Sequence, residues 1–514
     1  MFMIKGNPKI QAIRELSTHL DKIRGKKKVI LCHGVFDLLH IGHIKYFEAA
    51  KKAGDILVVT VTPDRFVNKG PDRPAFPEQL RGEAIAALSV VDYVALNEWP
   101  TAVETIQLLK PDIYAKGSEY KKPENDLTGK IVDEERALLE IGGTMLFTDD
   151  IVFSSSTLIN QFSSDFPDET RKFFQALAKA HGEKKIVSYI DNAQKLKVLV
   201  IGEAILDEYN YCDMIGVATK DPAIGVRYLS RERFCGGILA VANNLASFCE
   251  NVDLIAMLGQ FEPEESFIRE NLAGNVNPVF FYKENSPTIV KQRFVLEGPT
   301  IQKLFEVHKI NQLDLSPSQQ SSLHDLILSR INDYDLVLVV DFGHGFIAQA
   351  TARLISENAK YLAVNTQTNS GNRGFNVISK YPSADFICLN DLEIKLEERH
   401  NSGTVFDKIK NVAKKMSCSL AIVTQGKTGC ICFHAESGDE EIFIVPAFAK
   451  MVVDRIGSGD ALIAIASLCA VQKAPPVITG FIGNAAASVA VSIVGHRSSI
   501  DKVSFKKYLS TLLK

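Results

Sequence analysis

A short apolar run, a glycine-containing loop and a helix follow one another between residues 29 and 53, and this order limits what the chain can fold into. The run V-I-L at 29–31 predicts a buried strand, and residues 44–53 predict an amphipathic helix. A strand that feeds a helix through such a loop is typical of parallel sheets that bind phosphate groups. Unpaired N–H groups at the helix start carry a partial positive charge. We therefore expect an anion site there.

Two histidines lie at the start of this helix. His40 and His43 are three residues apart, so their side chains share one face of the first turn. Gly42 lies between them and, because it lacks a Cβ, lets a phosphate approach closely. Two imidazoles beside an anion can donate hydrogen bonds to charge developing on a transferring phosphoryl group. The alternative is an ordinary helix start with two surface histidines.

The longer string G-V-F-D-x-x-H-x-G-H at 34–43 is more specific than the histidine pair. It resembles the nucleotidyltransferase superfamily that includes the cytidylyltransferases, and the resemblance covers about residues 28–160. It implies a Rossmann-like nucleotidyltransferase domain in which His40 and His43 stabilise the α-phosphate. Without the resemblance, surface charge would explain Lys69 and Arg81, and a helix cap would explain the serines near 155. The implied nucleotide-binding residues are Gly34, Phe36, Gly42, Lys69, Arg81, Lys116, Gly117, Ser155, Ser156 and Thr157.

Strands and helices alternate up to about residue 147 and again from residue 195 onward. Such alternation predicts parallel α/β sheets. Extra β segments near 209–235 and 288–307 predict a small β lid on the second sheet, and the polar, helical stretch 161–194 predicts a linker helix. The sequence therefore predicts a first domain at 1–160, a linker, and a second domain at 195–514.

A second chemical centre is predicted at residues 454–460, which read D-R-I-G-S-G-D. Gly457, Ser458 and Gly459 precede a predicted helix and would form an anion hole for phosphate oxygens. Asp460 is then placed to accept a proton from an attacking hydroxyl group. A plain helix cap is the alternative.

This segment resembles the D-T-x-G-A-G-D motif of the ribokinase family, and segments at 202–207, 235–244, 340–345, 389–393 and 423–429 agree with that family. The resemblance covers about residues 195–514 and implies a ribokinase-like carbohydrate kinase that uses ATP and magnesium. It implies that Asp460 is the catalytic base and that Asn390 and Glu393 organise magnesium, directly or through water. The other implied residues are Thr424, Lys427, Gly429, Gly457, Ser458, Gly459 and Asn484 for the nucleotide, and Asp207, Gly236, Gly237 and Asn244 for the sugar.

Several positions depart from the ribokinase pattern. Ala240 replaces an asparagine, Asn365 replaces an aspartate, and Arg455 replaces the threonine of the D-T-x-G-A-G-D motif. These changes leave the sugar open and leave room for a weakened kinase. The Asn- and Gly-rich stretch 368–376 follows a strand end, so we expect it to line the cleft, with Arg373 gripping an acidic group. A solvent loop without a role is the alternative.

Together the two halves resemble the bifunctional heptose-phosphate kinase/nucleotidyltransferase enzymes, with the domain order reversed. The resemblance implies nucleotide-sugar synthesis, in which one domain phosphorylates a sugar or sugar phosphate with ATP. The other would transfer a nucleotidyl group from ATP or CTP to a sugar phosphate and release pyrophosphate. Two alternatives stay open: a catalytically dead kinase-like module that regulates an active transferase, and a cytidylyltransferase acting on a polyol or alcohol phosphate.

Composition argues against other classes of protein. The chain has 58 Lys and Arg against 61 Asp and Glu and no long basic run, so we expect no nucleic-acid partner. Its most apolar run, 477–494, contains Asn484 and many small residues, which favours a buried helix over a membrane span. With no signal peptide, nine cysteines indicate reduced thiols in the cytoplasm. The expected partners are sugar phosphates and nucleoside triphosphates, and we expect a homo-oligomer.

Overall fold

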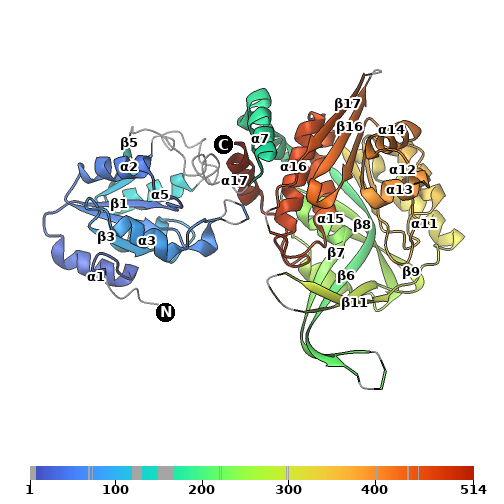
Figure 1. Cartoon of the computed structure of the whole chain (residues 1–514), viewed down its shortest axis with the longest axis horizontal. Coiled ribbons are helices and arrows are strands. Elements are labelled where there is room, and N and C mark those ends of the chain that lie inside the picture. The colour runs from blue at the N-terminus through green and yellow to red at the C-terminus, as the bar shows by residue number, and fades with distance from the viewer. Residues whose placement is uncertain are drawn as a thin grey trace. The chain divides into compact units, whose positions relative to one another are not determined.

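The chain forms two compact units, Met1–Asp165 with Val503–Lys514, and Phe166–Lys502. Figure 1 draws both units of this computed structural model. No described helix combines the length and apolar character that a membrane span needs. The residues that the structure describes are 7–67, 70–71, 73–117, 130–148, 166–218, 220–221, 223–296, 298, 300–400, 402–436, 439–449 and 451–514.

The described part of the first unit is built on a parallel sheet with the strand order β3-β2-β1-β4-β5. This order reverses between β1 and β4, and ligands bind such sheets in the crevice outside the carboxyl ends of the strands at that point. The predicted α/β fold of this part is confirmed. The strands are β1 (Val29–Gly34), β2 (Ile56–Val61), β3 (Tyr93–Leu96), β4 (Ile113–Gly117) and β5 (Thr144–Thr148). The helices are α1 (Ile13–Ile23), α2 (Ile41–Lys51), α3 (Glu78–Ala86), α4 (Val103–Leu109) and α5 (Ile131–Glu140).

Alternate residues of β1 point to opposite faces of this sheet, as strand geometry requires. Leu31 packs into a core with Leu16 of α1 and Ile106 of α4. Ile30 packs on the other face with Phe47 of α2 and Ile85 of α3. Helices therefore cover both faces, and the loop after β1 emerges at the sheet edge between them.

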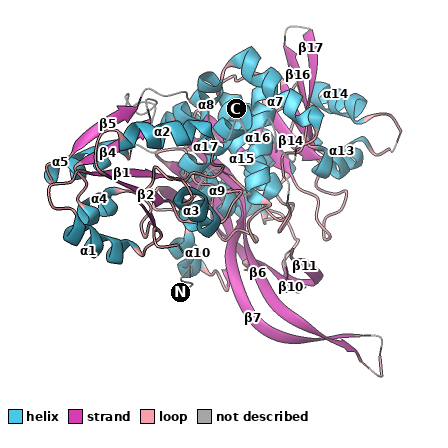
Figure 2. Ribbon diagram, turned by 60° about the vertical axis from the view of Figure 1, so that its left-hand side comes forward, coloured by secondary structure: helices cyan, strands magenta, loops and turns pink. Residues whose placement is uncertain are grey.

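The second unit contains a 12-stranded sheet in its described part. Its longest strand is β6 (Val198–Val217), which joins a central region to a lid. The first residues of β6 pair with β8 and β12 in the central region, and its later residues pair with β7 and β10 in the lid. Figure 2 shows β6 and β7 leaving the body of this unit as a two-stranded ribbon. The other strands are β7 (Ile224–Gly237), β8 (Val252–Phe261), β9 (Val276–Pro287), β10 (Ile289–Leu296), β11 (Gln302–Lys309), β12 (Leu336–Asp341), β13 (Leu362–Thr366), β14 (Phe386–Asn390), β15 (Leu420–Thr424), β16 (Cys430–Glu436) and β17 (Asp439–Val445).

Helices flank the central strands of this unit. The helix α15 follows the predicted anion-hole loop and packs against α16 and α9. Both α15 and α16 are buried nearly all round, which confirms the preference for a buried helix over a membrane span at 477–494. The helices are α9 (Ile238–Ala246), α10 (Glu265–Asn271), α11 (Pro317–Leu328), α12 (Gln349–Asn358), α13 (Asp391–Glu398), α14 (Val405–Lys415), α15 (Ser458–Val471) and α16 (Pro476–Ala490).

The structure differs from the predicted domain limits at two places. The stretch predicted as a linker helix forms two helices of the second unit in its described part, α7 (Asp168–His181) and α8 (Glu183–Asn192). Phe174 of α7 packs on Phe448 and Phe481 with ring centroids 5.0 and 6.1 Å apart, so this face of α7 is part of a core.

The C-terminal helix α17 (Lys502–Leu513) belongs, from Val503 on, to the first unit instead of the second. The ring of Tyr508 lies against the backbone of Gly70, where an added Cβ would come within 2.2 Å of it. A purely sequential division of the chain could not place this helix, because its contacts connect residues far apart in the sequence.

Candidate active sites

The predicted histidine motif forms the turn between β1 and α2. His40 is the N-cap of α2, and its Nδ1 accepts a hydrogen bond from the backbone N–H of Gly42 at 3.1 Å. The rings of His40 and His43 stack with their centroids 3.9 Å apart. Phe36 contacts His43 edge-on at 5.3 Å, from a backbone with φ of 47°. The structure therefore brings Phe36, His40, Gly42 and His43 together at one helix start.

The hydrogen bond from Gly42 fixes which nitrogen of His40 carries a proton. Burial lowers the pKa of His40, so the neutral ring is favoured. Because Nδ1 accepts, the proton of the neutral ring lies on Nε2. This Nε2 is buried and has no hydrogen-bond partner among the described residues. His40 thus holds a donor ready for an anion at the start of α2.

His33 is a half-buried neighbour of this site that sequence reasoning missed. Its Nδ1 lies 2.9 Å from Thr60 Oγ1 and its Nε2 lies 3.3 Å from Thr62 Oγ1, which ties β1 to β2. Burial, with a smaller contribution from the charge of Lys116, lowers the pKa of His33 to about 4. The only feature of the sequence that could have indicated His33 as a site residue was its place at the end of the strand, one residue before the motif.

Lys116 and Gly117 lie at the end of β4, beside β1, where the strand order reverses. Lys116 pairs with the buried Glu134 of α5 at 2.9 Å, and Glu134 also accepts from the hydroxyl of Tyr114 at 3.0 Å. The predicted residues Lys69, Ser155, Ser156 and Thr157 lie outside the described residues.

Arg81 holds loops in place instead of lying on the surface. It is 2% exposed, and its guanidinium donates to the carbonyl oxygens of Val35, Thr62 and Phe76. It also pairs with Asp64 at 2.5 Å. The alternative of a simple surface charge is therefore wrong, and these bonds engage most of the donors that the prediction of a phosphate contact assumed.

Asp37, the aspartate of the G-V-F-D string, has a similar role. Its buried carboxylate accepts from the backbone N–H of Ala75 at 2.6 Å and pairs with Arg73 at 3.2 Å. The loop after β2 is thereby held next to the loop after β1.

In the second unit, a cavity of about 400 Å³ opens at the ends of β13 and β14. Its walls come from the lid strands, from the strand ends and from the loop before α15. The predicted residues that line it are Asp207, Gly237, Asn390, Glu393, Thr424, Gly457, Ser458, Gly459 and Asp460.

Asp460 lies in the first turn of α15 and is buried, with its Oδ1 accepting from Gln367 Nε2 at 2.5 Å. Burial raises the pKa of this carboxyl group, while the charge of His496 lowers it. Gly457, the N-cap, has φ of +81°, a conformation that a residue with a Cβ rarely adopts. The loop therefore presents the N–H groups at the start of α15 beside a buried carboxylate.

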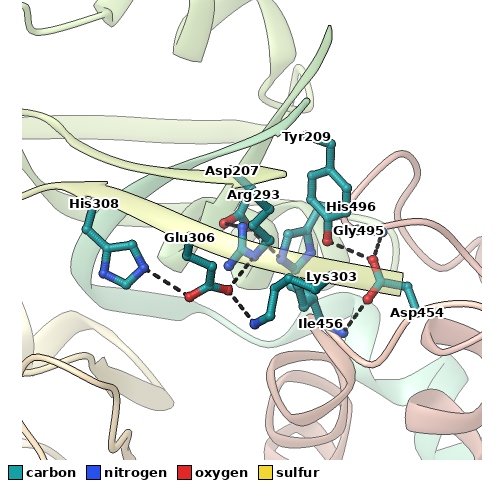
Figure 3. Close-up of polar contacts among 10 residues, drawn as sticks. All are labelled: Asp207, Tyr209, Arg293, Lys303, Glu306, His308, Asp454, Ile456, Gly495 and His496. Atoms are coloured by element: carbon teal, nitrogen blue, oxygen red, sulfur yellow. Dashed lines mark hydrogen bonds and ion pairs between the residues drawn. The ribbon is translucent and has the colours of Figure 1, made fainter. Parts of the chain in front are cut away.

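Charged side chains of the lid continue this site, as Figure 3 shows. Arg293 of β10 pairs with Asp207 of β6, and its Nε lies 3.3 Å from Glu306 of β11. Glu306 also binds Lys303 at 2.5 Å and His308 at 3.1 Å. The sequence singled out Asp207 but not Arg293, Lys303, Glu306 or His308, because these four belong to no motif and reach Asp207 only through strand pairing.

Asn390 and Glu393 form the capping box of α13. The Asn390 side chain accepts from the Glu393 N–H at 2.9 Å, and the Glu393 side chain accepts from the Asn390 N–H at 2.8 Å. Burial raises the pKa of Glu393 to about 7, and the charge of Asp460 adds to this shift.

The described residues contain no cluster of three or more His, Cys, Asp or Glu side chains placed to hold a metal. Hard oxygen atoms nevertheless line the cavity, which is the donor type that magnesium prefers. The buried Oδ1 of Asn365 has no hydrogen-bond partner among the described residues, and the carboxylate of Glu393 lines the same cavity. The free Oδ1 of Asn365 and the carboxylate of Glu393 therefore fit a magnesium ion, whereas the amide oxygen of Asn390 accepts from the Glu393 N–H.

Some predicted residues do not line the cavity. Asn244 accepts from the backbone N–H of Ile500 at 3.0 Å, and Asn484 donates to the carbonyl of Pro446 at 2.5 Å. Gly429 lies against the backbone of β17, where a Cβ would come within 2.0 Å of Val445 O. Lys427 lies in a single turn of 3-10 helix before β16, and Gly236 lies against Asp207.

The stretch 368–376 is only partly a wall of the cavity. Thr368 lines it, whereas Arg373 is exposed and does not. Asn372 donates to the carbonyl of Phe342 at 2.7 Å, and Asn376 donates to the carbonyl of Asp341 at 2.8 Å. The asparagines therefore fasten the loop to the end of β12, and the grip predicted for Arg373 stays a prediction.

Two family models match the chain. The model described as pfkB family carbohydrate kinase matches residues 195–503, and the one described as cytidylyltransferase-like matches residues 31–162. A protein named bifunctional protein HldE from Campylobacter jejuni subsp. jejuni is 28% identical over 319 residues, 61% of this chain and 65% of that protein. Another of that name from a Nitratiruptor species is 41% identical over 132 residues, 25% of this chain and 28% of that protein. The chain thus spans less than two thirds of the length of these curated relatives.

Among solved structures, phosphofructokinase-2 from Escherichia coli in complex with substrates and products is similar to the chain. The similarity covers 61% of this chain and 100% of that one, with 15% identity and a TM-score of 0.49.

Proposed function

The chain belongs to the pfkB family of carbohydrate kinases, and from this premise we propose that it is a bifunctional enzyme of nucleotide-sugar synthesis. The second unit phosphorylates a sugar or sugar phosphate with ATP. The first unit transfers a nucleotidyl group from ATP or CTP to a sugar phosphate and releases pyrophosphate. The cytidylyltransferase-like match at 31–162 and the relatives named bifunctional support the pairing of two activities.

The observation that carries the kinase proposal is the buried Asp460 at the start of α15, in one cavity with Asp207. The acceptor hydroxyl attacks the γ-phosphorus of ATP, its proton passes to Asp460, and the bond to the leaving ADP breaks. A raised pKa lies closer to neutral pH, so the carboxylate of Asp460 accepts a proton more readily than that of an exposed aspartate. The N–H groups at the start of α15 bind the phosphoryl oxygens as their charge grows.

Magnesium, when bound, neutralises charge on the phosphates of ATP. Asn365 and Glu393 are the residues that would hold it, directly or through water. Burial raises the pKa of Glu393 to about 7, and a bound cation would restore its charged form.

For the transferase, the carrying observation is the unpaired, buried Nε2 of His40 at the start of α2. A phosphate oxygen of the sugar phosphate attacks the α-phosphorus of the nucleoside triphosphate, and the bond to pyrophosphate breaks. His40 and the N–H groups of the first turn donate hydrogen bonds to the charge on the α-phosphate. His43 lies in stacking contact with His40 and presents a second ring to the same place.

The two steps suit one chain, because a kinase that makes a sugar 1-phosphate supplies the substrate of the transferase. The test is to measure magnesium-dependent ATP consumption with a panel of sugars and sugar phosphates, and pyrophosphate release from ATP and CTP with the phosphorylated products. Transfer of phosphate to some acceptor supports the proposal. Pyrophosphate release without any phosphoryl transfer would favour the alternative of a kinase-like regulatory module.

We also expect a homo-oligomer, and the ribbon formed by β6 and β7 supports this proposal. Beyond the pairing of β6 with β10, the ribbon exposes large apolar side chains: Met214, Ile215, Val217, Ile224 and Tyr228. Ile215, which is 73% exposed, is the most exposed of them. Light scattering on Ile215→Asp should give a lower molar mass than that of the unsubstituted chain, whereas an unchanged mass would exclude the ribbon from the contact.

A further inference from the structure

His496 is a polar wall residue of the kinase cavity that belongs to no motif. It follows Gly495 in the segment after α16, and its side chain is 10% exposed. Its Nε2 lies 3.4 Å from Asp207 Oδ2, as Figure 3 shows, and the ring lines the same cavity as Asp460. The position thus places an imidazole between the lid and the loop before α15.

Two glycines leave the space that this imidazole occupies. A Cβ on Gly457 would come within 2.2 Å of Cε1 and 2.8 Å of Nδ1 of His496. A Cβ on Gly236 would come within 3.3 Å of Cδ2 of the ring and 2.1 Å of Asp207 Oδ2. Any side chain at either position would displace the pair formed by Asp207 and His496. Three other segments, those of Asp207, Gly236 and Gly457, therefore converge on this one ring.

The surroundings of the ring are charged on several sides. Arg293 binds the same carboxylate of Asp207 that faces His496, and Lys291 lines the cavity beside them. His496 and Asp460 line the same cavity, and the charge of His496 lowers the pKa of Asp460. The charged residues that line the cavity with His496 are Asp207, Lys291, Arg293, Lys303, Glu306, Glu393, Arg455 and Asp460.

We propose that His496 is a further catalytic residue of the kinase, which donates a hydrogen bond from Nδ1 to the phosphoryl group transferred from ATP. The ring lies against Gly457, the residue that begins the anion hole, so a phosphoryl group bound at the start of α15 comes next to Nδ1. Asp207 engages Nε2 and orients the ring. This inference rests on the proposed kinase function.

The role in the reaction follows from where charge develops. As the acceptor oxygen forms its bond to phosphorus and the bond to ADP breaks, negative charge spreads over the oxygens of the transferring group. A donor fixed at those oxygens stabilises the transition state. The protonated ring, which pairs with Asp207 through Nε2, has a second N–H group at Nδ1 that can donate.

A structural role for His496, that of holding Asp207 in place, makes the opposite demands on the side chain. The amide of His496→Gln reaches the position of Nε2, so it keeps the bond to Asp207 and loses the donor at Nδ1. The amide of His496→Asn reaches the position of Nδ1, so it keeps that donor and loses the bond to Asp207. The two variants therefore separate the two roles, and their melting midpoints check that both fold.

The experiment measures kcat and KM for phosphoryl transfer in the full chain with these variants and with His324→Gln as a control. His324 binds Thr351 at 3.0 Å between α11 and α12 and does not line the cavity. We expect His496→Gln to lower kcat by about 10²–10³-fold, the usual cost of one lost donor to a developing charge. KM for the acceptor should change little, His496→Asn should lose less than about tenfold, and the control should match the unsubstituted chain. The reverse order, or unchanged kcat in His496→Gln, would overturn the proposal.

A binding measurement keeps this inference separate from the kinase proposal. The same variants are titrated with ATP and with ADP in the presence of magnesium. His496→Gln should weaken the affinity for ATP about tenfold more than that for ADP, since only ATP carries the group that Nδ1 contacts. Equal weakening of both, or none, overturns the proposal. If the unsubstituted chain transfers phosphate to no acceptor while this difference is present, the kinase proposal fails and the contact with His496 stands.

Discussion

Replacing Asp460 by asparagine tests the kinase chemistry with little change of shape. The amide of the variant would keep an oxygen that accepts from Gln367, whose Nε2 now lies 2.5 Å from Oδ1, so the packing at the start of α15 should survive. The variant loses the base that accepts the proton of the acceptor. Removing a positioned base typically costs 10²–10⁴-fold in rate, which corresponds to about 3–5 kcal/mol of barrier. Burial raises the pKa of Asp460, so the loss should fall toward the upper part of that range.

The assay compares Asp460→Asn with His43→Ala in both reactions of the full chain. Asp460→Asn should lose phosphoryl transfer from ATP with little change in acceptor binding, and it should keep pyrophosphate release. His43→Ala removes a donor from the stacked pair of histidines and should lower pyrophosphate release by about 10²–10³-fold. It should leave the kinase unchanged, because Asp460 lies in the other unit. Full kinase activity in Asp460→Asn would refute the assignment of this aspartate as the base.

Three further predictions concern stability, measured by urea unfolding. Burial lowers the pKa of His33 in the folded chain to about 4. The unfolded chain therefore takes up this proton first as the pH falls from 6.5 toward 4, and the free energy of unfolding should drop by about 3 kcal/mol over that range. His33→Gln should lose less stability than the unsubstituted chain over that window, and an equal loss would contradict the reasoning. Arg81→Met should cost about 3 kcal/mol by leaving buried carbonyl groups unpaired, whereas the exposed Arg136→Met should cost under about 0.5 kcal/mol. Deleting residues 503–514 should destabilise the transition of the first unit and leave that of the second unchanged, since α17 packs in the first. A loss confined to the second unit would refute that division.

Local patterns predicted the elements of the fold well. The strand predicted at 29–31 is β1, which begins at the predicted residue and ends three residues later, at Gly34. Short apolar runs and periodicities lie within one segment, so they can be recognised without knowing which distant segments pack against it. The length of β6 was not predicted, because its continuation into the lid depends on pairing with β7 and β10, which lie far along the chain.

The candidate sites also combine features that local sequence predicts with features that depend on distant segments. The glycine loops before α2 and α15 could be predicted from the sequence, because a helix start that binds anions needs small residues at a fixed spacing. Which residues face the cavity could be predicted only in part, since several motif residues line it and others do not. Asn244 fits its motif but binds the backbone of Ile500, and Arg81 fits its motif but holds three carbonyl groups inside the first unit. A motif gives the identity of a residue, whereas its direction depends on packing with distant segments.

This difference bears on where acceptor selectivity resides in the kinase. In the proposed kinase, Asp460 and the glycine loop act on atoms that every ATP-dependent transfer shares, so they say little about the sugar. The side chains on the other wall of the cavity, Arg293 and Lys303 of the lid strands, are held by the carboxylates of Asp207 and Glu306. Arg455 lines the same cavity from a position where the ribokinase pattern has threonine. Because Arg455 replaces the threonine of the family pattern, we expect Arg455→Thr to change which acceptor is used more than it changes the use of ATP.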